Sequence, residues 1–340
     1  MTASTRMRRV TVITVLLAAL LLSMVLAVAL GAVSVGAGEI LRAAGRAITG
    51  EPRAPGDAVI VDIRLPRVVL AALVGACLAA AGVLYQALFR NPLADPYILG
   101  MSSGAGLGAV IALTLTASAT ALRFGVVPAG AFAGAVLTIF LVVKLASLRG
   151  ALDVTSLLLA GVAISYALSA ITSFVMVFFR ESMASVVFWM MGGLTAASWS
   201  YVLMVIPMLV LGLAVPMTST RELNLMLLGE ERAGELGLDA ERYKRALLGS
   251  GALLVAGAVS VSGLIGFVGL MTPHMARLIV GPDHRLLLPA STIGGAIVMV
   301  LADLVARTAL APVEIPVGIV TAFVGAPFFI WLLVRRKDHR

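Results

Sequence analysis

Long runs without a charged residue dominate this chain, and they restrict its possible folds more than any other feature. Val68–Phe89, Phe124–Val143 and Val154–Phe179 are three of these runs. Each is long enough to cross a bilayer as a helix, which takes about 20 apolar residues. Only 12% of the residues are charged and 61% are hydrophobic, so a soluble globule of this length would lack polar surface. The pattern excludes a soluble enzyme and a disordered chain, and it predicts a polytopic membrane protein.

Counting the runs predicts an all-α membrane helix bundle with about ten transmembrane helices in a single domain, residues 1–340. Two overlong runs have to be divided. Residues 182–220 split into an interfacial loop or short helix and a span that begins near Tyr201. Ala246–Ala276 splits near Gly263–Gly269 into one full span and one short span, since glycines interrupt the run there.

The first apolar run, Val10–Gly38, follows three arginines and so resembles a signal peptide. A signal sequence has an apolar region of only about 7–15 residues, and this run is much longer. We therefore expect an uncleaved first helix. With ten spans and an inner N-terminus, 17 of the 25 lysines and arginines fall on the inner side, which favours a cell-membrane protein with both termini in the cytoplasm.

Arginines on the expected outer side are more frequent than membrane topology requires. Five of them lie between Arg42 and Arg67, where the positive-inside rule disfavours them. This excess suggests a partner outside the membrane.

The longest polar insertion, Thr218–Arg245, has two interpretations. It contains helix-forming residues and scattered leucines, and glycines at 229, 234 and 237 divide it. One interpretation is a solvated loop, and the other is a short helix on the cytoplasmic face that docks a partner. The spacing leaves both open.

Sequence signatures of catalysis are missing. There is no nucleotide-binding G-x-x-x-x-G-K-[ST] motif, no H-E-x-x-H and no pair of cysteines, so we expect no enzymatic activity, metal or cofactor. The acids Asp303 and Glu314 lie near outer helix ends rather than mid-span. An ion-coupled carrier usually keeps acids at the midplane and a membrane enzyme needs a polar cluster, so both alternatives are disfavoured. Transport driven by another subunit is favoured.

Four stretches carry a resemblance to a known family. They are IRLPR (63–67), GACLAAAGVLYQALFRNPLADPYILGMSSGAGLG (75–108), SGLIGFVGLMTPHMARLIVGPDHRLLLPAS (262–291) and LADLVARTALAPVEIPVGIVTAFVGAPFFIWLLVRR (301–336). In this order, over essentially the whole chain, they resemble the permease subunit of the FecCD family, the ABC importers of iron-siderophores and vitamin B12.

The resemblance implies a type II ABC importer permease fold and a homodimer with a translocation path along its axis. It further implies two ATP-binding subunits below the membrane, which would hydrolyse the ATP, and an extracytoplasmic substrate-binding protein above it. The strings RNPLADPYILG and GPDHR are closer to ferric-siderophore permeases. A ferric-siderophore cargo is therefore expected, with cobalamin or haem as the alternatives.

The resemblance also implies roles for individual residues on the two faces. Arg64, Arg67 and Arg307 match outward-facing arginines that receive acids of the binding protein. Guanidinium groups suit this because they pair bidentately with carboxylates, although snorkelling to the interface is the alternative. Asn91 with Leu93, and Thr155 with Ser156, match the two parts of a cytoplasmic gate.

The same comparison places the ATPase coupling helix within the polar insertion, about 218–245. Where the family usually has Ala-Arg-Ser-Leu-Gly, this chain has Ala-Gly-Glu-Leu-Gly. It thus loses a basic residue and gains an acid, so cross-pairing with another importer's ATPase is not expected. The residues implied in coupling are Glu231, Ala233, Gly234, Glu235, Leu236 and Gly237.

Overall fold

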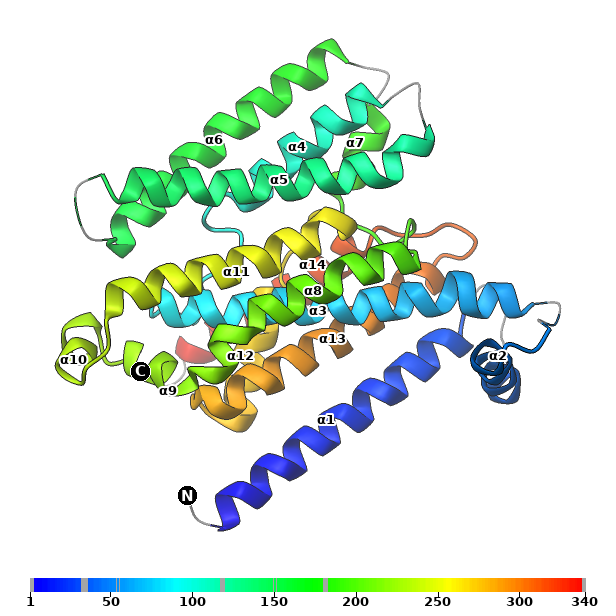
Figure 1. Cartoon of the computed structure of the whole chain (residues 1–340), viewed down its shortest axis with the longest axis horizontal. Coiled ribbons are helices and arrows are strands. Elements are labelled where there is room, and N and C mark those ends of the chain that lie inside the picture. The colour runs from blue at the N-terminus through cyan, green and yellow to red at the C-terminus, as the bar shows by residue number, and fades with distance from the viewer. Residues whose placement is uncertain are drawn as a thin grey trace.

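The computed structural model describes residues 3–31, 36–52, 54, 56–116, 120–148, 150, 152–179 and 183–337, and within them the regular elements are all helical (Figure 1). The all-α prediction is therefore confirmed. The elements are α1 (Ala3–Ala29), α2 (Ala37–Thr49), the π-helical turn η1 (Val59–Arg64), α3 (Leu65–Leu88), α4 (Met101–Leu115), α5 (Thr120–Ala146), α6 (Val154–Phe178), α7 (Met183–Met190), α8 (Trp199–Thr218), α9 (Thr220–Met226), α10 (Glu230–Glu235), α11 (Ala240–Ser262), α12 (Val268–Val280), α13 (His284–Thr308) and α14 (Val317–Lys337).

Eight of the described helices are long and apolar enough to cross a bilayer, and α4 and α12 are shorter apolar helices. Together they correspond to the ten predicted spans. The predicted division of the run 246–276 is confirmed, because α11 ends at Ser262 and α12 begins at Val268. Gly263 ends α11 with a positive φ of 66°, a conformation that glycine adopts without steric cost. The helix α2, between the first two spans, was not predicted.

The bundle is built around α3, which packs against α8, α11, α12 and α13. In its most apolar window, 89% of the residues are buried, compared with 11% in α6. The peripheral helices instead expose large apolar side chains such as Leu159, Phe174 and Phe323. Such surfaces suit lipid or a second protein copy, but not water.

Glycines allow α4 and α5 to lie side by side at backbone contact (Figure 1). Gly104 and Gly108 on α4 face Gly134 and Gly130 on α5, and a Cβ at Gly108 would lie 2.0 Å from the Gly130 carbonyl oxygen. Small residues four apart are a common device for close helix packing in membranes.

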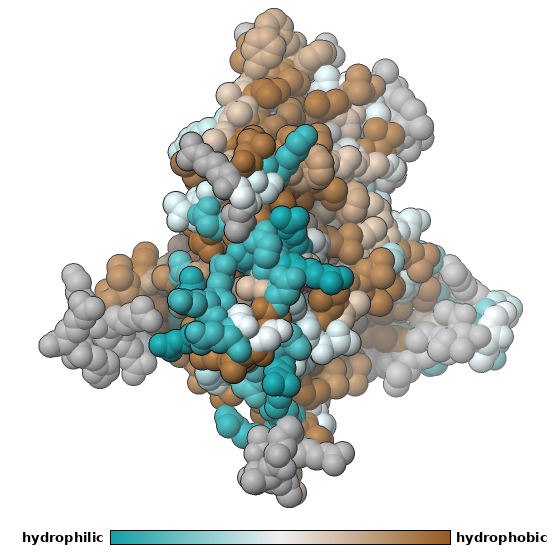
Figure 2. Space-filling model, turned by 60° about the vertical axis from the view of Figure 1, so that its left-hand side comes forward, coloured by the Kyte–Doolittle hydropathy of each residue, from teal (hydrophilic) through white to brown (hydrophobic). Residues whose placement is uncertain are grey.

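The polar insertion forms the short helices α9 and α10 and is not a plain loop, whereas docking of a partner on it stays a prediction. Gly229 and Gly237 separate the pieces with φ values of 102° and 87°, whereas Gly234 lies inside α10. Both helices lie at the end of the bundle where α1 begins and α14 ends, opposite α2 (Figure 1). Figure 2 shows hydrophilic side chains gathered at that end and largely apolar flanks beside it.

Candidate functional site

The three predicted docking arginines come from different elements, and two of them share one buried acid. Arg64 ends η1, Arg67 lies in the first turn of α3, and Arg307 lies near the end of α13. Asp303, one helical turn before Arg307, is the shared partner of Arg67 and Arg307. This cluster lies at the bundle end that is opposite α9 and α10 (Figure 1).

Arg67 links two helices and a loop through both edges of its guanidinium. Its Nε lies 3.0 and 3.1 Å from the two carboxylate oxygens of Asp303. Its Nη1 lies 3.0 Å from each carboxylate oxygen of Glu314, in the segment between α13 and α14. The Asp303 side chain is 1% exposed and that of Glu314 is 38% exposed, so only the Glu314 side of Arg67 is open to solvent or to a partner.

Arg64 and Arg307 bind the last carbonyl groups of α1. Arg64 Nη1 donates to the carbonyl oxygens of Val28, at 2.8 Å, and Ala29, at 3.3 Å. Arg307 donates to the carbonyl oxygen of Ala27. Carbonyls at a helix C-terminus have no partner within the helix and carry partial negative charge, so guanidinium groups stabilise them.

The arginines are thus part of the bundle's own structure, a role that residue type and position did not predict. The sequence contained one indication of a local ion-pair cluster, because the acids Asp303 and Glu314 lie near the same outer helix ends as these arginines. Docking of a binding protein at Arg64, Arg67 and Arg307 stays a prediction.

The first predicted gate pair lies in the segment between α3 and α4. Asn91 begins a tight turn in which its Oδ1 accepts a hydrogen bond from the Leu93 N–H at 2.9 Å, and the Leu93 side chain is exposed. Further along, the backbone of Leu99 lies against Gly161, since a Cβ there would meet the Leu99 Cα at 3.1 Å. The segment therefore packs on α6 above its first turn.

The second predicted gate pair, Thr155 and Ser156, lies in the first turn of α6. Asp153 caps this helix by accepting a hydrogen bond from the Ser156 N–H at 2.9 Å, as acids at N-caps commonly do. Hydrogen bonding from Ser156, with a smaller contribution from the Thr155 backbone, lowers the pKa of Asp153 below its ordinary value. The cap therefore remains charged near neutral pH, and the helix start is well defined.

The predicted coupling residues lie on and just after α10. Ala233 is fully buried and its carbonyl oxygen accepts a hydrogen bond from the Leu238 N–H at 3.0 Å, so the turn folds back on the helix. The other five predicted residues are exposed: Glu231, Gly234, Glu235, Leu236 and Gly237. A single exposed leucine is common on protein surfaces, so contact of this segment with an ATPase stays a prediction.

Several known proteins are similar to this chain over most of its length. The sequence profile of the FecCD transport family matches residues 17–335. The chain is 46% identical over 280 residues to the cobalamin import system permease protein BtuC of Halobacterium salinarum, covering 82% of this chain and 74% of that protein. It is 40% identical over 279 residues to the Fe(3+) dicitrate transport system permease protein FecD of Escherichia coli, covering 82% and 86%.

A solved structure agrees in fold over nearly the full length. It is an inward-facing conformation described as a metal-chelate type ABC transporter, and it superposes with a TM-score of 0.83 at 31% sequence identity. The match covers 96% of this chain and 99% of the other.

Proposed function

This chain belongs to the FecCD transport family and is the permease of an ABC importer, and from this premise we propose that its cargo is a ferric-siderophore complex. Members of this family are transport subunits and not enzymes. The observation that carries the proposal is the match of the whole bundle to a transporter of the metal-chelate type. The relative that serves Fe(3+) dicitrate supports iron as the metal.

Cobalamin is the second candidate cargo, because a relative 46% identical over 280 residues is a cobalamin import permease. Cobalamin is also a large metal chelate, so both candidate cargoes need a translocation path of similar width. In such importers the binding protein contributes much of the selectivity. Haem belongs to the same chemical group and is included in the test.

We propose that two copies of the chain form the path, with α6 on their shared face. Only 11% of the most apolar window of α6 is buried within one chain. Large apolar side chains of α6, such as Leu159, Tyr166 and Phe174, are exposed on the single chain. An exposed apolar face of this kind suits contact with a second copy.

Two ATP-binding subunits would bind the polar end formed by α9 and α10, and a substrate-binding protein would bind the opposite end. Support for the first contact comes from the exposed Leu227, Leu228 and Leu236 among charged residues. The charge distribution along the sequence supports a cytoplasmic membrane location with this end and both termini in the cytoplasm. Cargo would pass inward when the gate segments at 91–93 and 155–156 separate.

Uptake in a strain that lacks its own importers tests the cargo. The chain is expressed with the ATPase and binding protein of its own genome, and labelled ferric siderophore, cobalamin and haem are compared. We expect the ferric siderophore to accumulate, and uptake to continue when an uncoupler dissipates ion gradients while ATP is maintained. Accumulation of cobalamin or haem alone would overturn the iron proposal, and collapse with the gradient would argue against ATP as the energy source.

Arg67→Lys tests docking at the outer end. Lysine keeps the positive charge beside the buried Asp303. It lacks the second N–H edge of the guanidinium, which binds Glu314 and which a carboxylate of the partner would also bind. Loss of one charge-assisted hydrogen bond should weaken binding of the loaded substrate-binding protein about tenfold, as measured with the permease in nanodiscs.

Arg46→Lys is the matched control for docking. Arg46 in α2 also pairs bidentately, with Asp57 at 2.8 Å from both nitrogens, and it lies outside the predicted docking set. Equal binding by the parent and Arg67→Lys, or an equal loss in both variants, would contradict the assignment of Arg67.

A further inference from the structure

A buried lysine lies between the predicted coupling helix and the predicted gate. Lys244 is in the second turn of α11, and its side chain is 1% exposed. An ammonium group is seldom buried without close partners, because removing it from water costs several kcal/mol. Its partners therefore show what holds this part of the molecule together.

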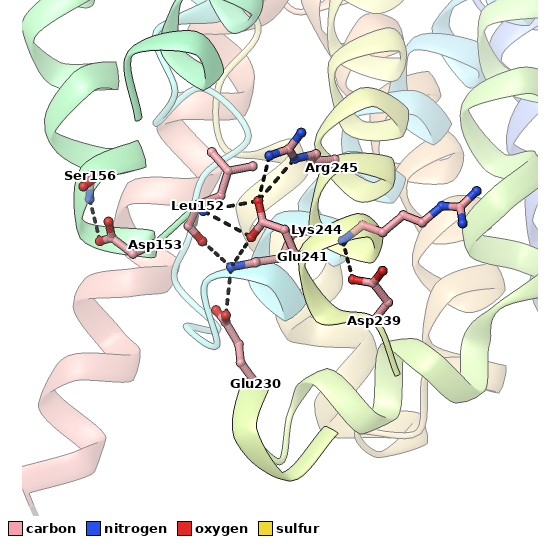
Figure 3. A network of polar contacts seen from close by, with 9 residues as sticks. Leu152, Asp153, Ser156, Glu230, Asp239, Glu241, Lys244 and Arg245 are labelled. Atoms are coloured by element: carbon pink, nitrogen blue, oxygen red, sulfur yellow. Dashed lines mark hydrogen bonds and ion pairs between the residues drawn. The ribbon is translucent and has the colours of Figure 1, made fainter. Parts of the chain in front are cut away.

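The Lys244 ammonium joins three segments (Figure 3). Its Nζ lies 2.8 Å from Oε2 of Glu230, the first residue of α10. It donates to the carbonyl oxygen of Leu152, in the segment that leads into α6. It also lies 3.4 Å from Oε2 of Glu241 on its own helix.

Leu152 is held from both sides of its peptide backbone. Its carbonyl oxygen binds Lys244, and its N–H donates to the Glu241 carboxylate at 3.1 and 3.3 Å. The next residue is Asp153, the cap of α6, which binds the N–H of Ser156. The position of Leu152 therefore sets the position of the first turn of α6, where Thr155 and Ser156 lie.

This contact is a direct route from α10 to α6. Along the chain, the start of α6 is separated from α10 by the spans α6 and α8 and by the short helices α7 and α9, so a movement that followed the chain would have to cross the membrane twice. The ion pair instead connects the start of α10 to the residue before the α6 cap. Charged contacts of this kind restrict distance and direction more than an apolar contact does.

We propose that Lys244 is a positioning residue that transmits displacement of α10 to the gate turn of α6. This inference rests on the proposed function, since it assumes that an ATPase displaces α10. With Lys244 in place, Glu230 and Leu152 move together. Without it, α10 can move while the gate turn stays where it is, and ATP hydrolysis is uncoupled from opening.

The test uses a reporter that does not depend on the cargo. Cys77 is the chain's single cysteine and is buried, so a Thr155→Cys substitution adds one accessible thiol at the gate turn. The permease is assembled with its ATPase in nanodiscs, and the rate of maleimide labelling is measured with and without ATP and vanadate. ATP hydrolysis is measured in the same samples.

We expect nucleotide to change the labelling rate of the reporter, and Lys244→Met to reduce that change about tenfold while hydrolysis stays within about twofold of the parent. Lys244→Arg should restore most of the response. Glu230→Gln breaks only the link to α10, and since Glu230 is 38% exposed this variant should assemble even if Lys244→Met does not. Glu230→Gln should also reduce the nucleotide-dependent change in labelling rate.

Arg245→Gln is the matched control, because Arg245 pairs with the same Glu241 carboxylate at 3.0 Å but is 57% exposed. Its response should equal that of the parent. The proposal is overturned if the parent reporter does not respond, if Glu230→Gln and Lys244→Met respond like the parent, or if hydrolysis falls in proportion to the response. Cargo uptake by the parent is measured separately, so a wrong cargo would leave the result on Lys244 intact.

Discussion

Asp303→Ala should destabilise the protein by about 3–5 kcal/mol, the usual cost of removing one partner from a buried ion pair. The substitution leaves Arg67 and Arg307, whose side chains are 11% and 7% exposed, next to each other without their shared acid. The two cations then repel in a region with little water to screen them. Because Arg307 also binds the end of α1, that helix should loosen from the bundle. Unfolding of the purified permease in mixed micelles measures the free energy.

Glu314→Ala is the control for this prediction. Glu314 pairs with the same Arg67 at 3.0 Å, but it is partly exposed, and exposed pairs contribute only about 0–1 kcal/mol. If the two variants unfolded at the same denaturant concentration, the buried cluster would not be the element that holds the outer end together.

Gly108→Ala should disrupt the packing of α4 against α5. The new Cβ would lie 2.0 Å from the carbonyl oxygen of Gly130, which is backbone and cannot turn aside. The helices would have to separate, and overpacking of this kind costs about 1–3 kcal/mol or more. A lower midpoint of thermal unfolding in detergent, together with a smaller yield of monodisperse protein, is the expected result.

Gly106→Ala is the control for this prediction, because it also replaces a glycine of α4 with alanine and adds the same volume. A Cβ at Gly106 meets no atom within 4 Å, so the free energy of unfolding should stay within about 0.5 kcal/mol of the parent. A similar loss in both variants would mean that helix packing at Gly108 is not the cause.

Much of the fold follows from local sequence. The length of an apolar run determines whether a helix can cross a bilayer, and this property needs no knowledge of other segments. For that reason the ten spans and the division near Gly263 were predictable, whereas the spacing of residues in the polar insertion left a loop and a short helix equally open. The helix α2 was not predicted, because its segment between two spans was considered only for the positions of its charged residues and not for its amphipathic pattern.

The candidate site was less predictable, because its contacts join residues far apart in the chain. Arg67 and Asp303 are 236 residues apart, and Lys244 and Leu152 are 92 apart. The resemblance to a family suggested where the arginines and the coupling helix lie. It did not indicate that Arg64 and Arg307 bind the end of α1, nor that a lysine links α10 to α6.

The sequence by itself determined that this chain is a membrane helix bundle of the FecCD type, since apolar length and long motifs are properties of contiguous residues. Only the tertiary structure decided which of the sparse charges are used inside the protein and which remain open to partners. The physical reason is that a charge in an apolar bundle must find an opposite charge or a free carbonyl nearby. Which group lies nearby depends on how distant helices pack, and no local pattern contains that information.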